Sequence, residues 1–384
     1  MTEPSTPLVS LEVPPGAERA LSAVRCPLSA DGREAHAPIL VTGGSGFLGI
    51  NLIRWLLAHG AQEVRSLDLV AFDYPEAADG RVKPVVGDVR NREAVRTLVA
   101  GCSAVIHCAA ALPLCSEEEI RSTDVDGARV VAEEALAAGV ARFVYISSTA
   151  VYGIPDHHPI TEGDRLEGVG PYGESKIIAE SIVRGLDSDG FAVTILRPKS
   201  FVGPERLGVF ALLYDWAYTG HGFPMIGRGD NRYQLLDVED LCDAIGLALT
   251  SADLAAVRET YNVGAREFAT MREDWQAVLD AAGYDKRVRA TPARLVIGVL
   301  RLLEALHLSP LYRWVYETAP QDSFVSVEKL CDRLGWQPKF SNRQALLRNY
   351  AWYVANIDRF RGQSGKTHRV PWKQGLLALA KRCF

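Results

Sequence analysis

Long apolar runs are missing from this sequence. The nearest approach, Ala293–Leu308, is interrupted by Arg294, Arg301 and Glu304, whereas a membrane-spanning helix needs about 18 or more consecutive apolar residues. The first residues also lack the basic region and the apolar stretch of a secretory signal. The sequence therefore predicts neither a transmembrane helix nor a signal peptide.

An excess of charge of one sign is missing as well. The 42 Lys and Arg residues nearly balance the 47 Asp and Glu residues and give a formal net charge of −5, so the composition does not call for a nucleic acid partner. The seven cysteines form no CxxC pair, which indicates a reduced, cytoplasmic chain without a metal site. With 48% hydrophobic and 23% charged residues, the composition excludes a coiled coil, a fibre and a disordered chain.

The 384 residues predict two domains, or one large domain with an additional lobe. Residues 1–37 carry five prolines without hydrophobic period, and we expect a poorly ordered extension there. From residue 38, short apolar runs alternate with helical periods, which is typical of an α/β doubly wound parallel sheet, the Rossmann fold. Strands are expected at 39–41, 63–69, 82–86, 104–109, 142–147 and 192–196, and helices at 120–138 and 172–186.

The alternation of strands and helices stops after Pro198. Residues 199–360 are expected to form a smaller, mainly helical substrate lobe over the carboxyl ends of the strands, where open α/β sheets bind ligands. Residues 260–264 are expected to return a strand to the dinucleotide-binding domain at 38–198. Residues 361–384 form a basic amphipathic tail.

A glycine-rich turn follows the first expected strand. Gly43, Gly46 and Gly49 stand at the spacing GxxGxxG, with Phe47 and Leu48 between the last two. Such glycines make a tight turn, let the backbone approach a pyrophosphate and let the following helix pack closely on the sheet. The free N–H groups at the start of that helix attract the diphosphate. These five residues are predicted to bind a dinucleotide.

Carboxylates end the second and third expected strands. Asp68 lies nineteen residues after Gly49, where a carboxylate accepts hydrogen bonds from the adenosine ribose and repels a 2′-phosphate. NAD is therefore favoured over NADP, with Asp73 as the alternative residue for this role. Asp88 and Val89 end the third strand, where the Asp88 carboxylate is expected to receive the adenine amino group.

Tyr172 and Lys176 stand at i and i+4, on one face of an expected helix. A free tyrosine has a pKa near ~10 and is a poor proton carrier at neutral pH, but an adjacent ammonium favours its phenolate. Such a tyrosine can move the proton of a hydroxyl group while hydride passes to or from a nicotinamide. The pair therefore predicts alcohol–ketone redox chemistry.

Together these motifs resemble the extended short-chain dehydrogenase/reductases, which include nucleotide-sugar epimerases and dehydratases and the 3β-hydroxysteroid dehydrogenases. The matching segments are TGGSGFLG (42–49), GDV (87–89), HCAA (107–110), YISSTAVYG (145–153), YGESK (172–176) and LRPKSFVGP (196–204). The resemblance covers roughly residues 38–360.

The resemblance implies roles for further residues. Ser148 would orient the substrate oxygen, and its neighbour Ser147 would not be catalytic. Pro198 would lie beside the nicotinamide carboxamide, and Ala109 and Ala110 would line the cofactor. Lys176 would also bind the nicotinamide ribose.

Two positions in a helix that supports the cofactor depart from the family pattern. Asp124 stands where the family often has Asn, and Ala128 stands where it often has Thr. The ligand contacts of this helix are therefore open to question, whereas the central chemistry is not.

The expected substrate is apolar. Nucleotide-sugar members of the family usually have Asn at the position of Ser200 and often Arg at that of Tyr233, although Arg232 is adjacent. Residues 291–340 resemble the steroid-dehydrogenase branch, whose apolar helix suits a lipid-like alcohol. The alternative is that the leucines of this helix only pack the lobe.

The leading hypothesis is therefore an NAD(P)-dependent oxidoreductase that acts on a secondary alcohol of a sterol or 3β-hydroxysteroid type, with a sterol-4-carboxylate as one form. The alternatives are a nucleotide-sugar epimerase or dehydratase with tightly bound NAD, and a non-catalytic dinucleotide-sensing protein.

The basic tail suggests a second kind of contact. Lys366–Phe384 contains Trp372, five Lys or Arg residues and no acid. This composition is typical of an amphipathic helix that lies on an anionic membrane. Peripheral contact with the inner membrane surface and a homodimer are further expectations. The alternative is that the tail packs on its own protein.

Overall fold

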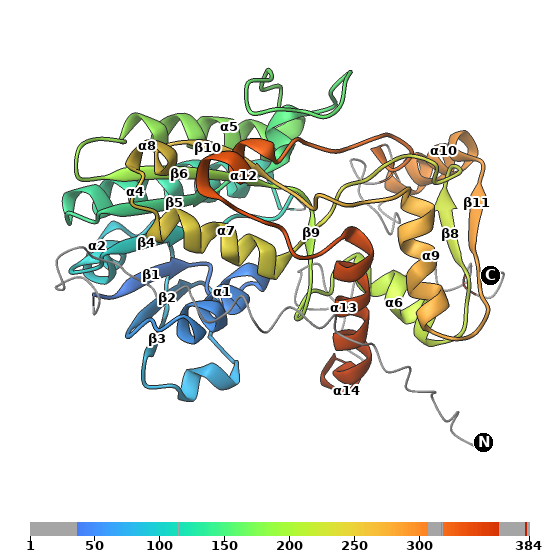
Figure 1. Ribbon diagram of the computed structural model, residues 1–384, viewed down its shortest axis with the longest axis horizontal. Helices are drawn as coiled ribbons and strands as arrows, with labels where there is room; N and C mark the ends of the chain where they lie inside the picture. Colours follow the sequence, from blue (N-terminus) through green and yellow to red (C-terminus); the bar gives the residue numbers. More distant parts are fainter. Residues whose placement is uncertain (1–36, 114, 306–315, 317, 361–380, 382–384) are drawn as a thin grey trace.

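The computed structural model describes residues 37–113, 115–305, 316, 318–360 and 381. Its centre is a seven-stranded parallel sheet in the order β10-β6-β5-β4-β1-β2-β3 (Figure 1). Its strands are β1 (Ile39–Thr42), β2 (Val64–Asp68), β3 (Val82–Val86), β4 (Ala104–His107), β5 (Arg142–Ile146), β6 (Ala192–Pro198) and β10 (Thr260–Val263). The α/β doubly wound fold predicted from the sequence is confirmed.

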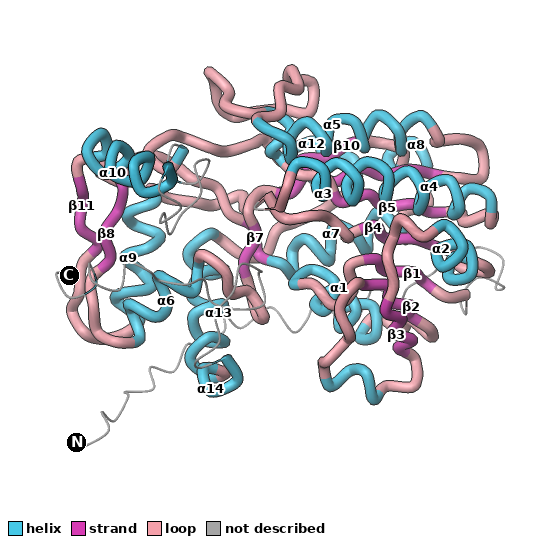
Figure 2. Tube along the Cα trace, turned by 180° about the vertical axis from the view of Figure 1, so that it is seen from behind, coloured by secondary structure: helices cyan, strands magenta, loops and turns pink. Residues whose placement is uncertain are grey.

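Helices cover both faces of the sheet, because its central strands are apolar on both sides. One face is covered by α1 (Phe47–Ala58), α7 (Val238–Thr250) and α12 (Glu328–Leu334). The opposite face, turned to the viewer in Figure 2, is covered by α2 (Arg92–Val99), α4 (Ala128–Ala137) and α5 (Gly170–Gly185). The shorter α8 (Leu254–Val257) leads into β10.

The helix expected at 120–138 is not a regular α-helix. It consists of α3 (Glu117–Arg121), a π-helical turn at Ser122–Gly127 and then α4. A π-helical turn often marks a functional site, and this one contains Asp124. Helix α2, which was not expected, begins where the Asn91 side chain accepts hydrogen bonds from the N–H groups of Glu93 and Ala94.

The remaining residues form a smaller lobe on one side of the sheet (Figure 1). Its helices are α6 (Phe210–Tyr218), α9 (Met271–Ala281), α10 (Ala293–Ala305), α13 (Asn342–Ala355) and α14 (Ile357–Phe360). It also contains two short parallel pairs that were not expected, β7 (Phe201–Val202) with β9 (Leu236–Asp237) and β8 (Phe223–Ile226) with β11 (Val288–Thr291). Its apolar core joins α6, α9 and α13.

The two ends of the chain are described only in part. The extension expected at 1–37 and the tail expected at 361–384 lie outside the described residues, apart from Ala37 and Lys381. The Lys381 ammonium forms an ion pair with Asp215 on α6, with 2.5 Å between Nζ and Oδ2. Within the described ranges, no helix combines the length and the apolar character that crossing a membrane requires.

Candidate active site

The glycine turn lies at the carboxyl end of β1, between β4 and β2, where the strand order reverses. Open α/β sheets bind ligands at this point. Gly43 has φ +71°, and a Cβ atom there would stand 2.8 Å from the Ala109 nitrogen. A Cβ on Gly49 would stand 2.2 Å from the Gly43 carbonyl oxygen. Neither position has room for a side chain, because Gly43 packs against the end of β4 and Gly49 packs the start of α1 onto the turn.

Helix α1 starts directly after Gly46, which is its N-terminal flanking residue. The N–H groups of the first turn, including those of Phe47 and Leu48, have no partner within the helix. The phenyl ring of Phe47 stacks on Phe201 with 5.4 Å between the ring centroids. The turn therefore offers hydrogen-bond donors to a diphosphate, and it is fixed to the smaller lobe.

Asp68 contacts the glycine turn directly. Its Oδ2 atom accepts a hydrogen bond from the Ser45 N–H at 3.0 Å, and its Oδ1 atom accepts one from the Val70 N–H at 3.0 Å. Asp73 lies on the exposed loop that follows β2. The structure thus places the Asp68 carboxylate beside the turn that would hold the dinucleotide.

Asp88 and Val89 follow β3. The guanidinium of Arg90 forms an ion pair with the Asp88 carboxylate, 2.5 Å between Nη2 and Oδ2, and this contact lowers the pKa of Asp88. Val89 is buried, and a Cβ on Gly127 would meet its side chain. The Asp88 carboxylate therefore already accepts hydrogen bonds from Arg90, and only its remaining acceptor sites could receive the adenine amino group.

Ala109, Ala110 and Pro198 line the same edge of the sheet. The Ala109 N–H donates to the Thr42 hydroxyl at 3.3 Å, next to the glycine turn. Pro198 ends β6, and its carbonyl oxygen accepts a hydrogen bond from the Thr149 hydroxyl at 3.4 Å. The alanines and the proline thus flank the carboxyl ends of the central strands.

The structure brings Ser148 and Tyr172 together. Ser148 follows β5 and precedes a short 3₁₀ turn at Thr149–Tyr152, whose Ala150 N–H donates to its Oγ atom at 3.1 Å. Tyr172 lies in the first turn of α5. Burial raises the pKa of Tyr172, the charge of Asp124 raises it further, and a hydrogen bond with the Ser148 side chain opposes the rise.

Ser147 is used elsewhere. Its hydroxyl donates a 2.5 Å hydrogen bond to the buried carboxylate of Glu180, which also pairs with the Arg197 guanidinium. Arg197 in turn donates to the Tyr152 hydroxyl at 2.8 Å. This network joins α5 to β6 beneath the site.

Lys176 is 1% exposed, and its ammonium has neighbours that the sequence did not indicate. Nζ donates to the Tyr145 hydroxyl at 3.4 Å and to the Ile146 carbonyl oxygen at 3.3 Å. It lies 5.8 Å from the centroid of the Tyr172 ring. Burial lowers the pKa of Lys176, but Tyr145 and Asp124 outweigh this effect, and the net shift is upward.

Asp124 was noted in the sequence only as a departure from the family pattern. In the structure it is buried, and its Oδ1 atom accepts a 2.7 Å hydrogen bond from the Ala111 N–H. Its Oδ2 atom has no hydrogen-bond partner and lies 3.9 Å from Lys176 Nζ. Burial raises the pKa of Asp124, and the Lys176 ammonium opposes this rise. A buried carboxylate thus stands beside the Ser148–Tyr172–Lys176 cluster.

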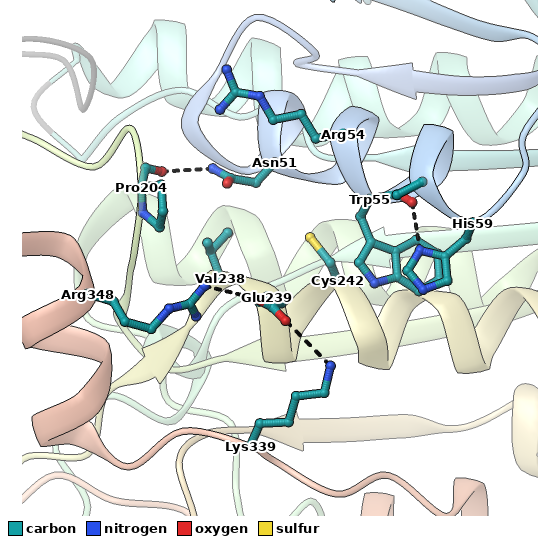
Figure 3. A pocket seen from close by; sticks show the side chains of 11 residues that line it. Asn51, Arg54, Trp55, His59, Pro204, Val238, Glu239, Cys242, Lys339 and Arg348 are labelled. Atoms are coloured by element: carbon teal, nitrogen blue, oxygen red, sulfur yellow. Dashed lines mark hydrogen bonds and ion pairs between the residues drawn. The ribbon is translucent and has the colours of Figure 1, made fainter. Parts of the chain in front are cut away.

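A separate pocket of about 270 Å³ lies on the outer side of α1, against α7 and the smaller lobe (Figure 3). None of the site residues predicted from the sequence lines it. Its cations are paired with acids: Arg54 with Glu76 and Glu205, Lys339 with Glu239 and Asp243, and Arg348 with Asp237 and Glu239. These ion pairs join the two parts of the molecule, and we assign the pocket no ligand.

Comparisons with known proteins find similar sequences and solved structures. The model of the NAD dependent epimerase/dehydratase family matches residues 39–264. An uncharacterized protein of Sinorhizobium fredii is 35% identical over 342 residues, 88% of this chain and 84% of the relative. A 3-beta-hydroxysteroid dehydrogenase of Mycolicibacterium neoaurum is 29% identical over 354 residues, 85% of this chain and 94% of the relative.

A solved structure from the sugar-modifying part of the family is also similar. It is a dTDP-glucose 4,6-dehydratase of Streptomyces venezuelae with NAD bound, 27% identical with a TM-score of 0.69. The match covers 85% of this chain and 99% of that one. Relatives with steroid and with nucleotide-sugar substrates therefore stand at similar distances.

Proposed function

Because the chain belongs to the NAD-dependent epimerase/dehydratase family, we propose that it interconverts a secondary alcohol and a ketone on an apolar, sterol-like substrate with NAD. The observation that carries this proposal is the meeting of Ser148, Tyr172 and Lys176 beside the glycine turn. A protein that only senses a dinucleotide does not require this set.

The residues of the chain fit NAD. The positions of Gly43 and Gly49 leave no room for a side chain, the start of α1 offers N–H donors, and the Asp68 carboxylate lies beside the turn. These residues would hold the adenosine and diphosphate parts. When bound, NAD supplies the acceptor or donor of hydride.

The reacting hydroxyl would lie between Ser148 and Tyr172. The Ser148 hydroxyl orients the substrate oxygen, and the Tyr172 oxygen accepts the proton of the alcohol during oxidation or returns it during reduction. The buried ammonium of Lys176 stabilises negative charge on the neighbouring phenol. Burial raises the pKa of Tyr172 further above its ordinary value, so the free phenol is protonated at neutral pH.

The relative with a steroid substrate supports an apolar substrate, and so does the surface of α10. Leu295, Val299 and Leu302 lie on one face of this helix and are 67%, 50% and 63% exposed. Contiguous exposed apolar residues often mark a contact with a lipid or another apolar partner. This face of α10 could serve as an apolar surface over which a sterol-like substrate enters.

The second candidate is a nucleotide-sugar epimerase or dehydratase, which the solved relative favours. The side chains at the matching positions favour it less. Tyr233 forms a hydrogen bond with Ser200, 3.1 Å between the hydroxyl oxygens. The guanidinium of Arg232 lies 4.7 Å from the ring centroids of both Phe268 and Phe324. Arg232 is the neighbouring residue that could replace the missing arginine, and its guanidinium is already engaged in these two contacts.

The fate of added NAD separates the two candidates. We expect purified protein to convert NAD to NADH in step with oxidation of a 3β-hydroxysterol, measured by NADH absorbance and by chromatography of the sterol. An epimerase or dehydratase regenerates its NAD in each turnover and accumulates no NADH. Conversion of UDP-glucose or dTDP-glucose without net NADH would overturn the proposal in favour of the second candidate.

Replacing Asp68 with Ala is expected to weaken NAD binding by about 10-fold or more, because hydrogen bonds to charged groups contribute about 1.5–3 kcal/mol. The affinity for NADP should fall less, because the carboxylate no longer repels the 2′-phosphate. Titration of NAD and of NADP into the wild type and the variant measures the ratio of the two affinities. Asp73→Ala is the matched control. If the ratio of NAD to NADP affinity changed only in Asp73→Ala, Asp73 rather than Asp68 would be the residue that binds the adenosine ribose.

Replacing Asp124 with Asn is expected to move the pH profile of alcohol oxidation to lower pH. The rate rises with pH as Tyr172 loses its proton, and the negative charge of Asp124 raises the pKa of Tyr172. Asn retains the acceptor for the Ala111 N–H, so folding should be preserved. The measurement is kcat/KM against pH for the wild type and the variant.

The other titratable groups that face Asp124 are Lys176, Tyr145 and Cys115, and they are the same in the wild type and the variant. Asp126→Asn is the matched control, because Asp126 lies in the same π-helical turn and is exposed. If the midpoint of the pH profile stayed the same or moved to higher pH, the side chain of Asp124 would be protonated or would serve only to accept the hydrogen bond from the Ala111 N–H.

A further inference from the structure

Glu180 and Arg197 form an ion pair beneath the site, and the chemistry above does not use it. Each residue is 5% exposed. The Arg197 guanidinium donates from Nε to Oε1 of Glu180 at 2.9 Å and from Nη2 to Oε2 at 2.5 Å. Apolar residues of similar volume often replace a buried ion pair without loss of stability, because taking two charges out of water is costly. Stabilising the fold is therefore not a sufficient reason for this pair.

The two partners of the ion pair hold opposite ends of one short segment. This segment, Ser147–Tyr152, follows β5 and contains the serine proposed to orient the substrate oxygen, and we call it the serine segment. At its start, the buried hydroxyl of Ser147 donates to Oε1 of Glu180 at 2.5 Å. At its end, Nη1 of Arg197 donates to the hydroxyl of Tyr152 at 2.8 Å. One ion pair thus contacts the segment on both sides of the serine.

The partners themselves belong to elements that carry other groups of the site. Glu180 lies four residues after Lys176 and eight after Tyr172, on the same side of α5. Arg197 lies on β6, directly before Pro198 at the carboxyl end of the strand. The ion pair therefore ties the serine segment both to the helix of the tyrosine and lysine and to the edge of the sheet where the site lies.

The position of Ser148 relative to Tyr172 depends on how this segment is held. The Oγ atom of Ser148 accepts a hydrogen bond from the Ala150 N–H at 3.1 Å, but both groups belong to the segment and move with it. The Ser147 N–H donates to the Leu196 carbonyl oxygen at 2.8 Å, a bond that ties the segment to β6 and not to α5. A misplacement of reacting groups by about 1 Å can cost about 10²-fold in rate. An anchor on α5, the helix of the tyrosine, therefore matters for catalysis.

We propose that the Glu180–Arg197 ion pair positions Ser148 opposite Tyr172 by holding both ends of the serine segment. The pair is too deeply buried to touch substrate or cofactor, so its two members act as positioning residues. The inference rests on the proposed function, because the placement of Ser148 matters only if this serine orients the reacting hydroxyl. It applies to either candidate substrate, since both reactions use the same serine and tyrosine.

Ser147→Ala and Tyr152→Phe each remove one hydroxyl group at an end of the serine segment and leave the ion pair intact. We expect each variant to lower kcat by about 10-fold, because the serine is less precisely placed, and to leave the affinity for NAD unchanged. Steady-state kinetics and calorimetric titration of NAD measure the two quantities. Wild-type kcat in both variants would overturn the proposal.

Thr194→Val is the matched control. Thr194 is buried in β6 opposite Val144, in the middle of β5, and its hydroxyl donates to the Val257 carbonyl oxygen at 2.5 Å. This variant also loses one buried hydroxyl hydrogen bond, so its free energy of unfolding should fall about as much as in Ser147→Ala. Its kcat should stay at the wild-type value. An equal loss of kcat in the control would refute a specific effect on the serine segment.

A double-variant cycle tests whether the effect passes through Ser148. The kcat values of Ser148→Ala, Tyr152→Phe and the variant with both changes are compared. If the ion pair acts by positioning Ser148, Tyr152→Phe should add less than about 2-fold to the loss in Ser148→Ala, because the group that it positions is gone. Independent losses that multiply would contradict the proposal.

The ion pair itself is removed by Glu180→Leu together with Arg197→Met. Because neither charge is left buried alone, this double variant should remain folded and bind NAD, whereas kcat should fall by about 10²-fold. Denaturant unfolding checks the fold. Full turnover by the folded double variant would show that the pair has no part in the reaction.

Hydrogen exchange separates a failure of the positioning from a failure of the proposed function. In Ser147→Ala and Tyr152→Phe, amide exchange in peptides that cover the serine segment should be faster than in the wild type and in Thr194→Val. If the wild type converts neither a 3β-hydroxysterol nor UDP-glucose, the proposed function fails and exchange alone decides. Equal exchange in the wild type and in both variants would then refute the positioning.

Discussion

Replacing Tyr172 with Phe is expected to lower turnover by about 10²- to 10⁴-fold, the usual loss for a positioned acid or base. The affinity for NAD should stay close to that of the wild type, because the ring and Lys176 remain in place. Steady-state kinetics gives the turnover, and titration of NAD against tryptophan fluorescence gives the affinity. Activity within a few-fold of the wild type would refute the role of Tyr172.

Tyr145→Phe is the matched variant for this experiment. The Tyr145 hydroxyl, rather than that of Tyr172, accepts a hydrogen bond from Lys176 Nζ, so the structure contains two tyrosines beside one lysine. Tyr145 is fully buried in β5, where no substrate can contact it, and we expect Tyr145→Phe to retain most of the activity. If Tyr145→Phe lost much more activity than Tyr172→Phe, Tyr145 would be the residue that carries the proton.

Replacing Gly49 with Ala should abolish NAD binding at concentrations that saturate the wild type. The new Cβ atom would stand 2.2 Å from the Gly43 carbonyl oxygen and 2.5 Å from Gly44 Cα. Because both neighbours are backbone atoms, the turn has to move away from α1. Overpacking of this kind typically costs about 1–3 kcal/mol, so the free energy of unfolding should also fall. Calorimetric titration of NAD and denaturant unfolding measure the two effects.

Two other glycines serve as controls. A Cβ on Gly46 would lie 3.1 Å from the Gly43 carbonyl oxygen, so Gly46→Ala should fold with less loss of stability. If the turn binds the diphosphate as proposed, the added methyl group should still weaken NAD, because it narrows the approach to the backbone. Gly185 ends α5, and nothing lies within 4 Å of a Cβ there, so Gly185→Ala should leave NAD binding unchanged and should not lower the free energy of unfolding. Normal NAD binding by Gly49→Ala would place the diphosphate elsewhere.

Several features of the site follow from local sequence alone. The apolar run before the glycines predicts a buried strand, and the spacing of Gly43, Gly46 and Gly49 predicts the turn that β1 and α1 form. The i, i+4 spacing of Tyr172 and Lys176 places them on one face of α5. These patterns are short in sequence, and backbone geometry converts each directly into a local structure.

The surroundings of Lys176 could not be predicted in the same way. Its ammonium contacts Tyr145 on β5 and faces Asp124 in a π-helical turn, and no local pattern links these three positions. The sequence did single out Asp124, as a departure from the family pattern, but not its contact with the lysine. Such contacts depend on the order of the strands and on how the helices pack over them.

By itself, the sequence determined the α/β doubly wound fold, the glycine-rich turn after the first strand and the tyrosine–lysine pair, because each depends on periodicity and spacing within a few residues. Only the tertiary structure decided which groups surround them. It brought Ser147 and Arg197 from distant segments to Glu180, and it paired the short strands of the smaller lobe. The physical reason is that burial and long-range packing set the charge and the hydrogen bonds of a side chain, and neither quantity is encoded in its near neighbours.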